Sequence, residues 1–295
     1  MSILVIGACN IDLIGISGQK LIPHESNIGE IKIALGGVAK NIATDLHYLG
    51  ADVSFVTLIG NDYFSGLQKK ELDELGLDFH KSFFRDTLSS TYLAIHDSDG
   101  DMSMAVNDMR AFEKLSIEDF REIDDYIESF DNIVLDTNLN QEVLEYLIKT
   151  YEHKNIYVDG VSQSKVVRLK GILSHINLLK INKYELNSLL EAEDCDIILG
   201  VKKLMGLGLS NCLVSSSNDP ITYNIETNIY QSITHKNKYI KSTMGAGDAL
   251  FAGTIFYLSK GKNMHEAVNF GKIVASKTLE VQEACNKEIK ELIDL

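Results

Sequence analysis

One stretch near the end of this 295-residue chain is more informative than any other: Ser242-Thr243-Met244-Gly245-Ala246-Gly247-Asp248. It runs directly into the small and apolar residues 249–253. Glycines let backbone amides approach a ligand closely, and a helix that begins here would direct its unpaired N–H groups and positive dipole end at the same spot. The stretch therefore predicts a phosphate seat. Because a bound anion would repel Asp248, we expect this carboxylate to accept a proton from a sugar or nucleoside hydroxyl.

The same seven residues also fit a second interpretation, a glycine-rich helix start chosen for tight packing and capped by an aspartate. Composition narrows the choice of partner. The 28 basic and 42 acidic residues give a net charge of −14, which argues against a nucleic-acid or anionic membrane surface. The 4 cysteines have no CxxC spacing, and no apolar run reaches the ~18 residues that span a bilayer. We therefore expect a soluble, cytoplasmic protein with reduced thiols.

Apolar strand-like runs alternate with helix-period segments along the chain. Continuous Val/Ile/Leu runs separated by helices are typical of a parallel sheet buried on both faces, and such sheets place ligands beyond the carboxyl ends of their strands. The predicted strands are 3–7, 53–59, 132–135, 155–158, 176–181 and 212–215, and the predicted helices are 38–49, 63–75, 117–129 and 141–151. The fold class is thus α/β, a central and mostly parallel sheet flanked by helices.

Two stretches break this alternation. Residues 15–35 and 89–105 have the pattern of antiparallel strands, and the second contains the turn sequence Asp97-Ser98-Asp99-Gly100-Asp101. They predict a small sheet inserted into the main domain, covering about 13–35 and 89–108. The alternative is a pair of hairpins without a function. We find no repeat or linker, so residues 1–295 are expected to form one domain.

Three further groups carry candidate chemistry. Gly36 and Gly37 precede a predicted helix whose Asn41 offers both a donor and an acceptor to hydroxyls, although a glycine pair at this place is often only a turn. Asp12 follows the first strand and has the hydrogen-bonding capacity for a sugar diol, or for capping a turn. Asn182 and Glu185 are three residues apart, which suits a hydrated magnesium ion and also a helix cap.

Taken together and in this order, these motifs resemble those of the ribokinase-like (PfkB) carbohydrate kinases, and the resemblance covers essentially the whole chain. It implies a ribokinase-like fold with a β-sheet lid, ATP as donor and Mg²⁺ as cofactor. It also implies an anion hole at Gly245, Ala246 and Gly247, with Asp248 as the base. The substrate sugar is held by Asp12, Gly36, Gly37 and Asn41, and Asn182 and Glu185 organise magnesium and phosphate. In this family the lid often joins two subunits, so we expect a homodimer.

Within the family, several segments resemble pseudouridine kinases, which implies a nucleoside phosphorylated on its 5′-hydroxyl. The segments are 36–43, 91–94, 106–109, 135–139 and 158–162 with Lys165. Asn138 lies where the family commonly makes a substrate contact. Asn10 and Asn107 are candidates for reading the base, because amides can pair with a uracil edge.

Two positions depart from the family pattern. Ser242 replaces the leading aspartate of the C-terminal signature, so a monovalent-cation requirement is doubtful. The segment Val214-Ser215-Ser216-Ser217-Asn218-Asp219 lacks the usual Gly-x-x-Gly of the nucleotide loop. Ser215 remains a candidate phosphate contact, and the choice of ATP over GTP comes from the resemblance alone.

Other functions stay open at this point. A ribokinase or a purine-nucleoside kinase would share the motifs, whereas a non-catalytic sugar-binding protein on the same scaffold should lack Asp248. An NAD-dependent oxidoreductase should show GxGxxG after the first strand, and residues 7–12 do not. The expected function is therefore phosphotransfer to a small sugar or nucleoside.

Overall fold

The computed structural model describes residues 2–216, 220–233 and 239–293. Its main element is an eight-stranded sheet with the order β14-β13-β12-β11-β10-β9-β1-β4. From β12 to β4 the neighbouring strands are parallel, whereas β13 and β14 continue the edge as an antiparallel hairpin. The strands are β1 (Ser2–Ile6), β4 (Asp52–Val56), β9 (Asn132–Asp136), β10 (Asn155–Asp159), β11 (Leu178–Asn182), β12 (Cys212–Ser215), β13 (Ile221–Ile225) and β14 (Asn228–Ser232). The mostly parallel sheet is confirmed; the hairpin was not anticipated.

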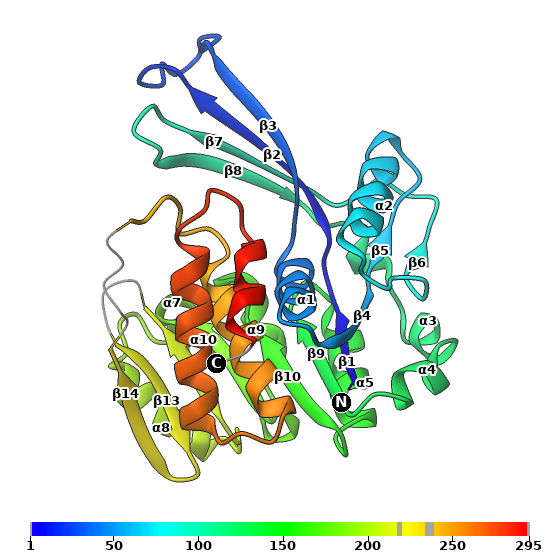
Figure 1. The fold of residues 1–295 in the computed structure, drawn as a ribbon, viewed down its shortest axis with the longest axis vertical. Helices are drawn as coiled ribbons and strands as arrows, with labels where there is room; N and C mark the ends of the chain where they lie inside the picture. The colour runs from blue at the N-terminus through cyan, green and yellow to red at the C-terminus, as the bar shows by residue number, and fades with distance from the viewer. Residues whose placement is uncertain (1, 217–219, 234–238, 294–295) are drawn as a thin grey trace.

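Helices cover both faces of this sheet (Figure 1). The alternation within one strand explains why: Ile3 and Val5 enter one apolar cluster with α1, α9 and α10, whereas Leu4 and Ile6 enter the other with α5, α7 and α8. A strand buried on both faces needs an unbroken apolar run, which is what the sequence provides. The helices are α1 (Val38–Tyr48), α5 (Gln141–Thr150), α7 (Lys183–Leu189), α8 (Ile197–Gly206), α9 (Ala246–Ser259) and α10 (Met264–Thr278).

The remaining elements lie beside β4. They are α2 (Tyr63–Leu75), the pair β5 (Leu58–Ile59) and β6 (Phe83–Phe84), α3 (Ile117–Arg121) and α4 (Asp124–Glu128), whereas the short α6 (Gln163–Val166) packs against α7. The run 53–59 is divided at Thr57 into β4 and β5, and the expected helix 117–129 is two short helices. The second break follows from Glu122 and Ile123, which leave α3 before Asp124 and Asp125 begin a new first turn.

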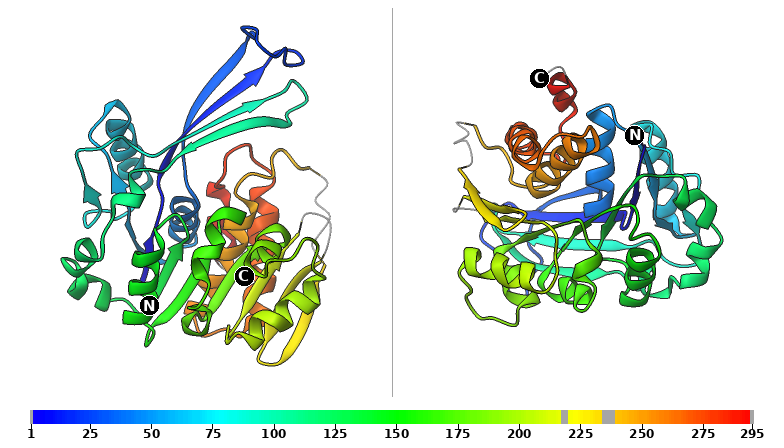
Figure 2. Two further views of the ribbon diagram at one scale, coloured as in Figure 1. Left: turned by 180° about the vertical axis from the view of Figure 1, so that it is seen from behind. Right: turned by 90° about the horizontal axis from the view of Figure 1, so that it is seen from below.

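A second, four-stranded sheet projects from the main body (Figures 1 and 2). Its order is β3-β2-β7-β8, formed by β2 (Asn10–Ser17), β3 (Gly29–Gly36), β7 (Thr91–His96) and β8 (Met102–Asp108). The expected antiparallel stretches are present, and the sheet begins three residues earlier than predicted, at Asn10. Because β1 leads into β2 after only Gly7, Ala8 and Cys9, the carboxyl ends of the parallel strands face the root of this small sheet.

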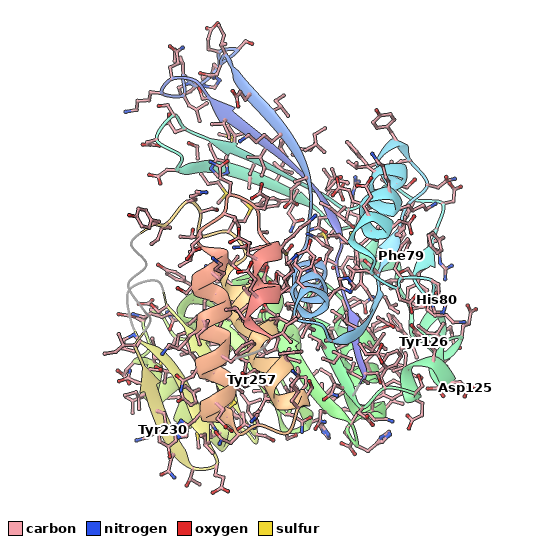
Figure 3. All side chains as sticks on the ribbon, viewed as in Figure 1. Phe79, His80, Asp125, Tyr126, Tyr230 and Tyr257 are labelled. Carbon is pink, nitrogen blue, oxygen red and sulfur yellow. The ribbon has the colours of Figure 1, made fainter. Side chains whose placement is uncertain are left out.

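Aromatic side chains pack between α9 and α10, in the part of the molecule that lies away from the small sheet. Tyr257 of α9 stacks on Phe270 of α10 with 3.9 Å between ring centroids, well away from the small sheet (Figure 3). Among the described residues, no helix combines the length and apolarity that crossing a membrane requires.

Candidate active site

The predicted phosphate seat is the first turn of α9. Gly245 precedes the helix with a φ of 73°, a left-handed conformation that favours glycine. A Cβ at this position would lie 1.9 Å from the carbonyl oxygen of Ala284, so the C-terminal loop packs directly against the turn. The first N–H groups of an α-helix have no partner within the helix, and the Ala246 amide makes only a long bond of 3.4 Å to the Thr243 carbonyl, so the amides at 245–247 can turn to an anion.

Asp248 lies within this first turn and is 9% exposed. Its Oδ2 accepts a hydrogen bond of 2.8 Å from Nδ2 of Asn41 on α1, although 207 residues separate the two. Burial raises the pKa of Asp248 to about 7, against the opposing effect of the Lys180 ammonium. A carboxylate with this pKa accepts a proton at neutral pH far more readily than an exposed aspartate.

Asp12 and the glycine pair meet at the root of the small sheet. A Cβ on Gly36 would lie 2.0 Å from Oδ2 of Asp12, so only glycine leaves room for this carboxylate. Gly37 has a φ of 105° and turns the chain into α1. Burial raises the pKa of Asp12 to about 6. Its Oδ1 and the Oδ1 of Asn10 are buried without a hydrogen-bond partner in the described structure, which is unusual for polar groups outside a ligand site.

Strand register places Asn107 in the same row of the small sheet as Asp12. Asp12 pairs with Tyr92 on β7, and Tyr92 pairs with Asn107 on β8, so the three side chains share one face. Burial, together with the Asp12 carboxylate, raises the pKa of Tyr92. Asn107 is exposed and Tyr92 was not anticipated. This polar face is the one that carries Asp12.

Asn138 lies just past β9 and is 3% exposed. Its Nδ2 donates to Asp136 at 2.9 Å, and its Oδ1 accepts from the Lys165 ammonium at 2.5 Å. Asp136 also accepts from the backbone amides of Ala8 at 3.1 Å and Ala39 at 3.2 Å. This one carboxylate therefore ties the end of β1, the start of α1 and Asn138 together.

Asn182 and Glu185 form a reciprocal cap at the start of α7. Oδ1 of Asn182 accepts from the Glu185 amide at 2.9 Å, and Glu185 accepts from both the Asn182 backbone at 2.9 Å and its Nδ2 at 2.6 Å. The capping interpretation is confirmed. Ser215, which pairs with Asn182 in the sheet, ends the neighbouring strand, whereas residues 217–219 of the same segment lie outside the described residues.

The side-chain oxygens of Asn182 and Glu185 are of the type that magnesium prefers. Glu185 already uses both oxygens within the cap, and the described residues contain no group of three or more His, Cys, Asp or Glu side chains suited to a metal. A dedicated protein cage is therefore absent from the described structure, but Mg²⁺ commonly keeps most of its waters and needs only one or two carboxylates. The pair fits a hydrated ion held through water.

Sequence reasoning missed several buried charged residues that surround Asp248. Lys180 forms an ion pair with Asp159 at 2.9 Å. Lys40 and Asp45 of α1 are also buried. The Lys40 charge lowers the pKa of Asp248, and the Asp248 charge raises the pKa of Asp45. Lys180 carried a usable signal, because it is a charged residue inside the apolar run 176–181. The other three carried no signal that distinguishes them from surface charges.

Solved structures show the same architecture. Arabidopsis thaliana ribokinase in complex with ribose and ATP superimposes with a TM-score of 0.85 at 19% identity, covering 99% of this chain and 97% of the other. Among sequence relatives, pseudouridine kinase of Escherichia coli strain K12 is 28% identical over 97% of this chain and 93% of its own length. Guanosine-inosine kinase of Exiguobacterium acetylicum is 24% identical over 99% and 98% of the two chains.

The fold comparison, the order of the motifs and the sequence relatives agree, and the model of the pfkB family of carbohydrate kinases matches residues 1–291. The protein thus has the ribokinase-like fold. The chain belongs to the pfkB carbohydrate kinase family, phosphotransferases that act on an alcohol group.

Proposed function

We propose that this enzyme transfers the γ-phosphoryl group of ATP to the 5′-hydroxyl of a ribonucleoside, with pseudouridine as the preferred acceptor. The observation that carries the phosphotransfer is the position of Asp248. It is buried in the first turn of α9, fixed by Asn41 at 2.8 Å, with a pKa raised to about 7. A base at the mouth of a phosphate seat is the arrangement that transfer to an alcohol requires.

Each group in the site has a distinct task in this proposal. Asp248 takes the proton from the acceptor hydroxyl, whose oxygen then bonds to phosphorus as the bond to the ADP oxygen breaks. The amides at 245–247 stabilise negative charge on the moving phosphoryl group. Asp12, Gly37 and Asn41 hold the ribose, consistent with the unpaired Oδ1 of Asp12.

Two observations favour pseudouridine as the acceptor. The relative from Escherichia coli is a pseudouridine kinase, and the segments that resemble such enzymes include both members of the Asn138–Lys165 pair. Lys165 donates to the Oδ1 of Asn138, and the Nδ2 of Asn138 donates to Asp136. These two hydrogen bonds fix the orientation of the Asn138 side-chain amide toward any ligand. We assign base recognition to Asn138 together with Asn10 and Asn107.

ATP and Mg²⁺ are the proposed donor and metal, as is usual for the family. Glu185 and Asn182 would hold the ion through water, and Ser215 would contact phosphate. Magnesium supplies charge neutralisation of the donor phosphates when bound. We do not extend the proposal to a monovalent cation, because the Oγ of Ser242 accepts from the Met244 amide at 3.1 Å and no aspartate stands there. All four cysteines are free thiols, in keeping with a cytoplasmic location.

We also propose that the small sheet acts as the lid and joins two copies of the chain. The face opposite Asp12 consists of apolar side chains in register across the four strands. Its exposed members are Ile31, Ile33, Leu93, Met104 and Val106. Self-association would cover this face, since contiguous exposed apolar patches are rare on monomers. Light scattering should give a dimer, and I33E/V106E should give a monomer; a monomeric wild type would refute the assembly.

A panel of acceptors tests the proposed function. Pseudouridine, uridine, cytidine, inosine, adenosine, ribose and fructose 6-phosphate are compared with Mg-ATP as donor. Pseudouridine should have the highest kcat/KM. Uridine is the strictest control because it joins the same base to ribose through a different atom, and a buried polar group left without its partner costs about 1–3 kcal/mol, roughly 5- to 150-fold.

Each other outcome of the panel has a defined meaning. Ribose as the best acceptor would make the enzyme a ribokinase, and inosine would make it a purine-nucleoside kinase, as the 24% identical relative suggests. In both cases the kinase assignment survives and the pseudouridine assignment fails. Ligand binding without any turnover would support a non-catalytic sugar-binding protein instead.

A further inference from the structure

A lysine lies inside the main sheet, directly behind the proposed phosphate seat. Lys180 is in β11 between the buried residues Leu179 and Ile181, and it is itself 7% exposed. A charge at such a position is unfavourable unless the surroundings compensate it. The presence of this charge within an apolar strand therefore needs a physical explanation.

The compensating partner is Asp159, at the carboxyl end of the neighbouring strand β10. Nζ of Lys180 lies 2.9 Å from Oδ2 of Asp159, which is 1% exposed. The other oxygen, Oδ1, accepts from the Val161 amide at 2.8 Å. Val161 has a φ of 57°, a conformation that β-branched residues rarely adopt, and such strain concentrates at functional sites. The strained turn holds the Asp159 carboxylate with one oxygen facing Lys180.

The ammonium is also in contact range of the phosphate seat. A Cβ added to Gly247 would lie 3.0 Å from Nζ of Lys180 and 3.5 Å from its Cε. A Cβ there would make a tight contact with the ammonium, so glycine gives the lysine the most room beside the backbone of the seat. Asp248 follows in the same turn, and Lys180 is the charge that most opposes the effect of burial on its pKa.

A role in folding alone does not account for this arrangement. A buried ion pair is weak evidence for stability, because replacing both partners by apolar groups of similar volume is often neutral or stabilising. The lysine, the glycine that admits it and the strained Val161 all converge on one turn of the chain. That convergence is expected if the charge acts on the chemistry at the seat.

We propose that Lys180 is a positioning residue for phosphoryl transfer: oriented by Asp159, its ammonium lies behind Gly247 and adds positive charge to the amide seat at 245–247. This inference rests on the proposed kinase function and extends it to a residue that does not touch the acceptor. Lys180 keeps its proton throughout. The proton of the acceptor hydroxyl goes to Asp248, and the electron pair of the broken P–O bond goes to ADP.

A double-mutant cycle tests this role with the variants Lys180→Met, Asp159→Asn and the two combined. Losing a unit charge a few ångströms from the phosphoryl group should lower kcat about 10- to 100-fold in Lys180→Met, with the acceptor KM changed less than about 3-fold. The combined variant leaves no unpaired charge in the sheet, and it should remain equally slow because the ammonium is still missing. Recovery of kcat to near wild type in the combined variant would overturn the proposal and leave only an ion pair.

Two controls separate this test from other failures. Lys154→Met removes a largely buried lysine that pairs with Glu128 at 3.1 Å, at the opposite end of β10, and it should leave kcat unchanged. The acceptor is whichever panel member the wild type phosphorylates fastest, so a wrong choice of nucleoside does not affect the comparison. If the wild type phosphorylates none of them, the proposed function fails first. Should Lys180→Met not fold, the combined variant alone decides between the two outcomes.

Discussion

Replacing Asp248 by asparagine separates catalysis from stability in this enzyme. The amide keeps the shape of the carboxylate, and its Oδ1 can still accept the 2.8 Å hydrogen bond from Asn41. It cannot accept a proton, so kcat should fall by about 10²- to 10⁴-fold, the usual contribution of a general base. The acceptor KM should change little, because ribose binding is assigned to Asp12 and Asn41.

The stability of the same variant should move in the opposite direction. A pKa of about 7 in the folded protein, against an ordinary value of 3.8, means that the folded state favours the protonated carboxyl. The stability from this preference is fully present below pH 3.8 and is lost as pH rises toward 7, at most about 4 kcal/mol. Asp248→Asn removes the buried charge, so at pH 8 its free energy of unfolding should equal or exceed that of the wild type.

Steady-state kinetics and urea denaturation measure the two effects. In the wild type, kcat should fall below pH 7 by about tenfold per pH unit, so that at pH 5.5 it is roughly 30-fold below the plateau. Wild-type turnover in Asp248→Asn would refute the base assignment. A flat pH profile from 5.5 to 8 would refute the raised pKa, even if the residue proved essential.

Two further perturbations test the neighbouring groups. Glu185→Gln should raise the magnesium concentration needed for half-maximal rate, because a water-mediated contact to the ion loses its charge. The control Glu191→Gln, at an exposed residue, should leave that concentration unchanged. Superimposable magnesium titrations of Glu185→Gln and the wild type would mean that Glu185 is only a helix cap. Gly36→Ala places a Cβ 2.0 Å from Oδ2 of Asp12 and should raise the acceptor KM at least about tenfold, since about 1.4 kcal/mol suffices for that change. Its control, Gly66→Ala, meets no atom within 4 Å, and equal KM values in the two variants would contradict the assignment of Asp12 to the acceptor.

The sequence was sufficient for those parts of the molecule that follow from local pattern. The parallel strands, the helix at 38–48 and the helix start at Ala246 all came from periodicity or from glycine, and each lies within a few residues of its predicted bounds. The break between α3 and α4 could not be predicted, because the helical periodicity of the sequence continues across Glu122 and Ile123. The hairpin of β13 and β14 was missed for a related reason: short strands at a sheet edge have little apolar signal.

Long-range contacts were largely beyond sequence reasoning. Asp136 directly follows a predicted strand and had no assigned role, yet it accepts hydrogen bonds from the amides of Ala8 and Ala39, which lie about 100 residues away in the sequence. The motifs identified Asn41 and Asp248 separately, whereas their mutual hydrogen bond depends on how α1 packs beside α9. Pairing of this kind is a property of the tertiary fold, which single-sequence patterns do not encode.

The buried carboxylates of this site differ mainly in how many hydrogen-bond donors each one has, and that difference favours Asp248 as the proposed base. Asp136 accepts four N–H hydrogen bonds, three of them from backbone amides. These bonds occupy its lone pairs, so its role is to fix the backbone segments that it contacts. Asp159 is matched by Lys180. The carboxylate oxygens of Asp45 have no hydrogen-bond partner in the described structure, and burial raises the pKa of this group well above its ordinary value. Asp248, with one hydrogen-bond donor and the charges of Lys180 and Lys40 acting on it, lies between these extremes. A pKa of about 7 and a single hydrogen-bond donor favour Asp248 over the other three carboxylates as the base.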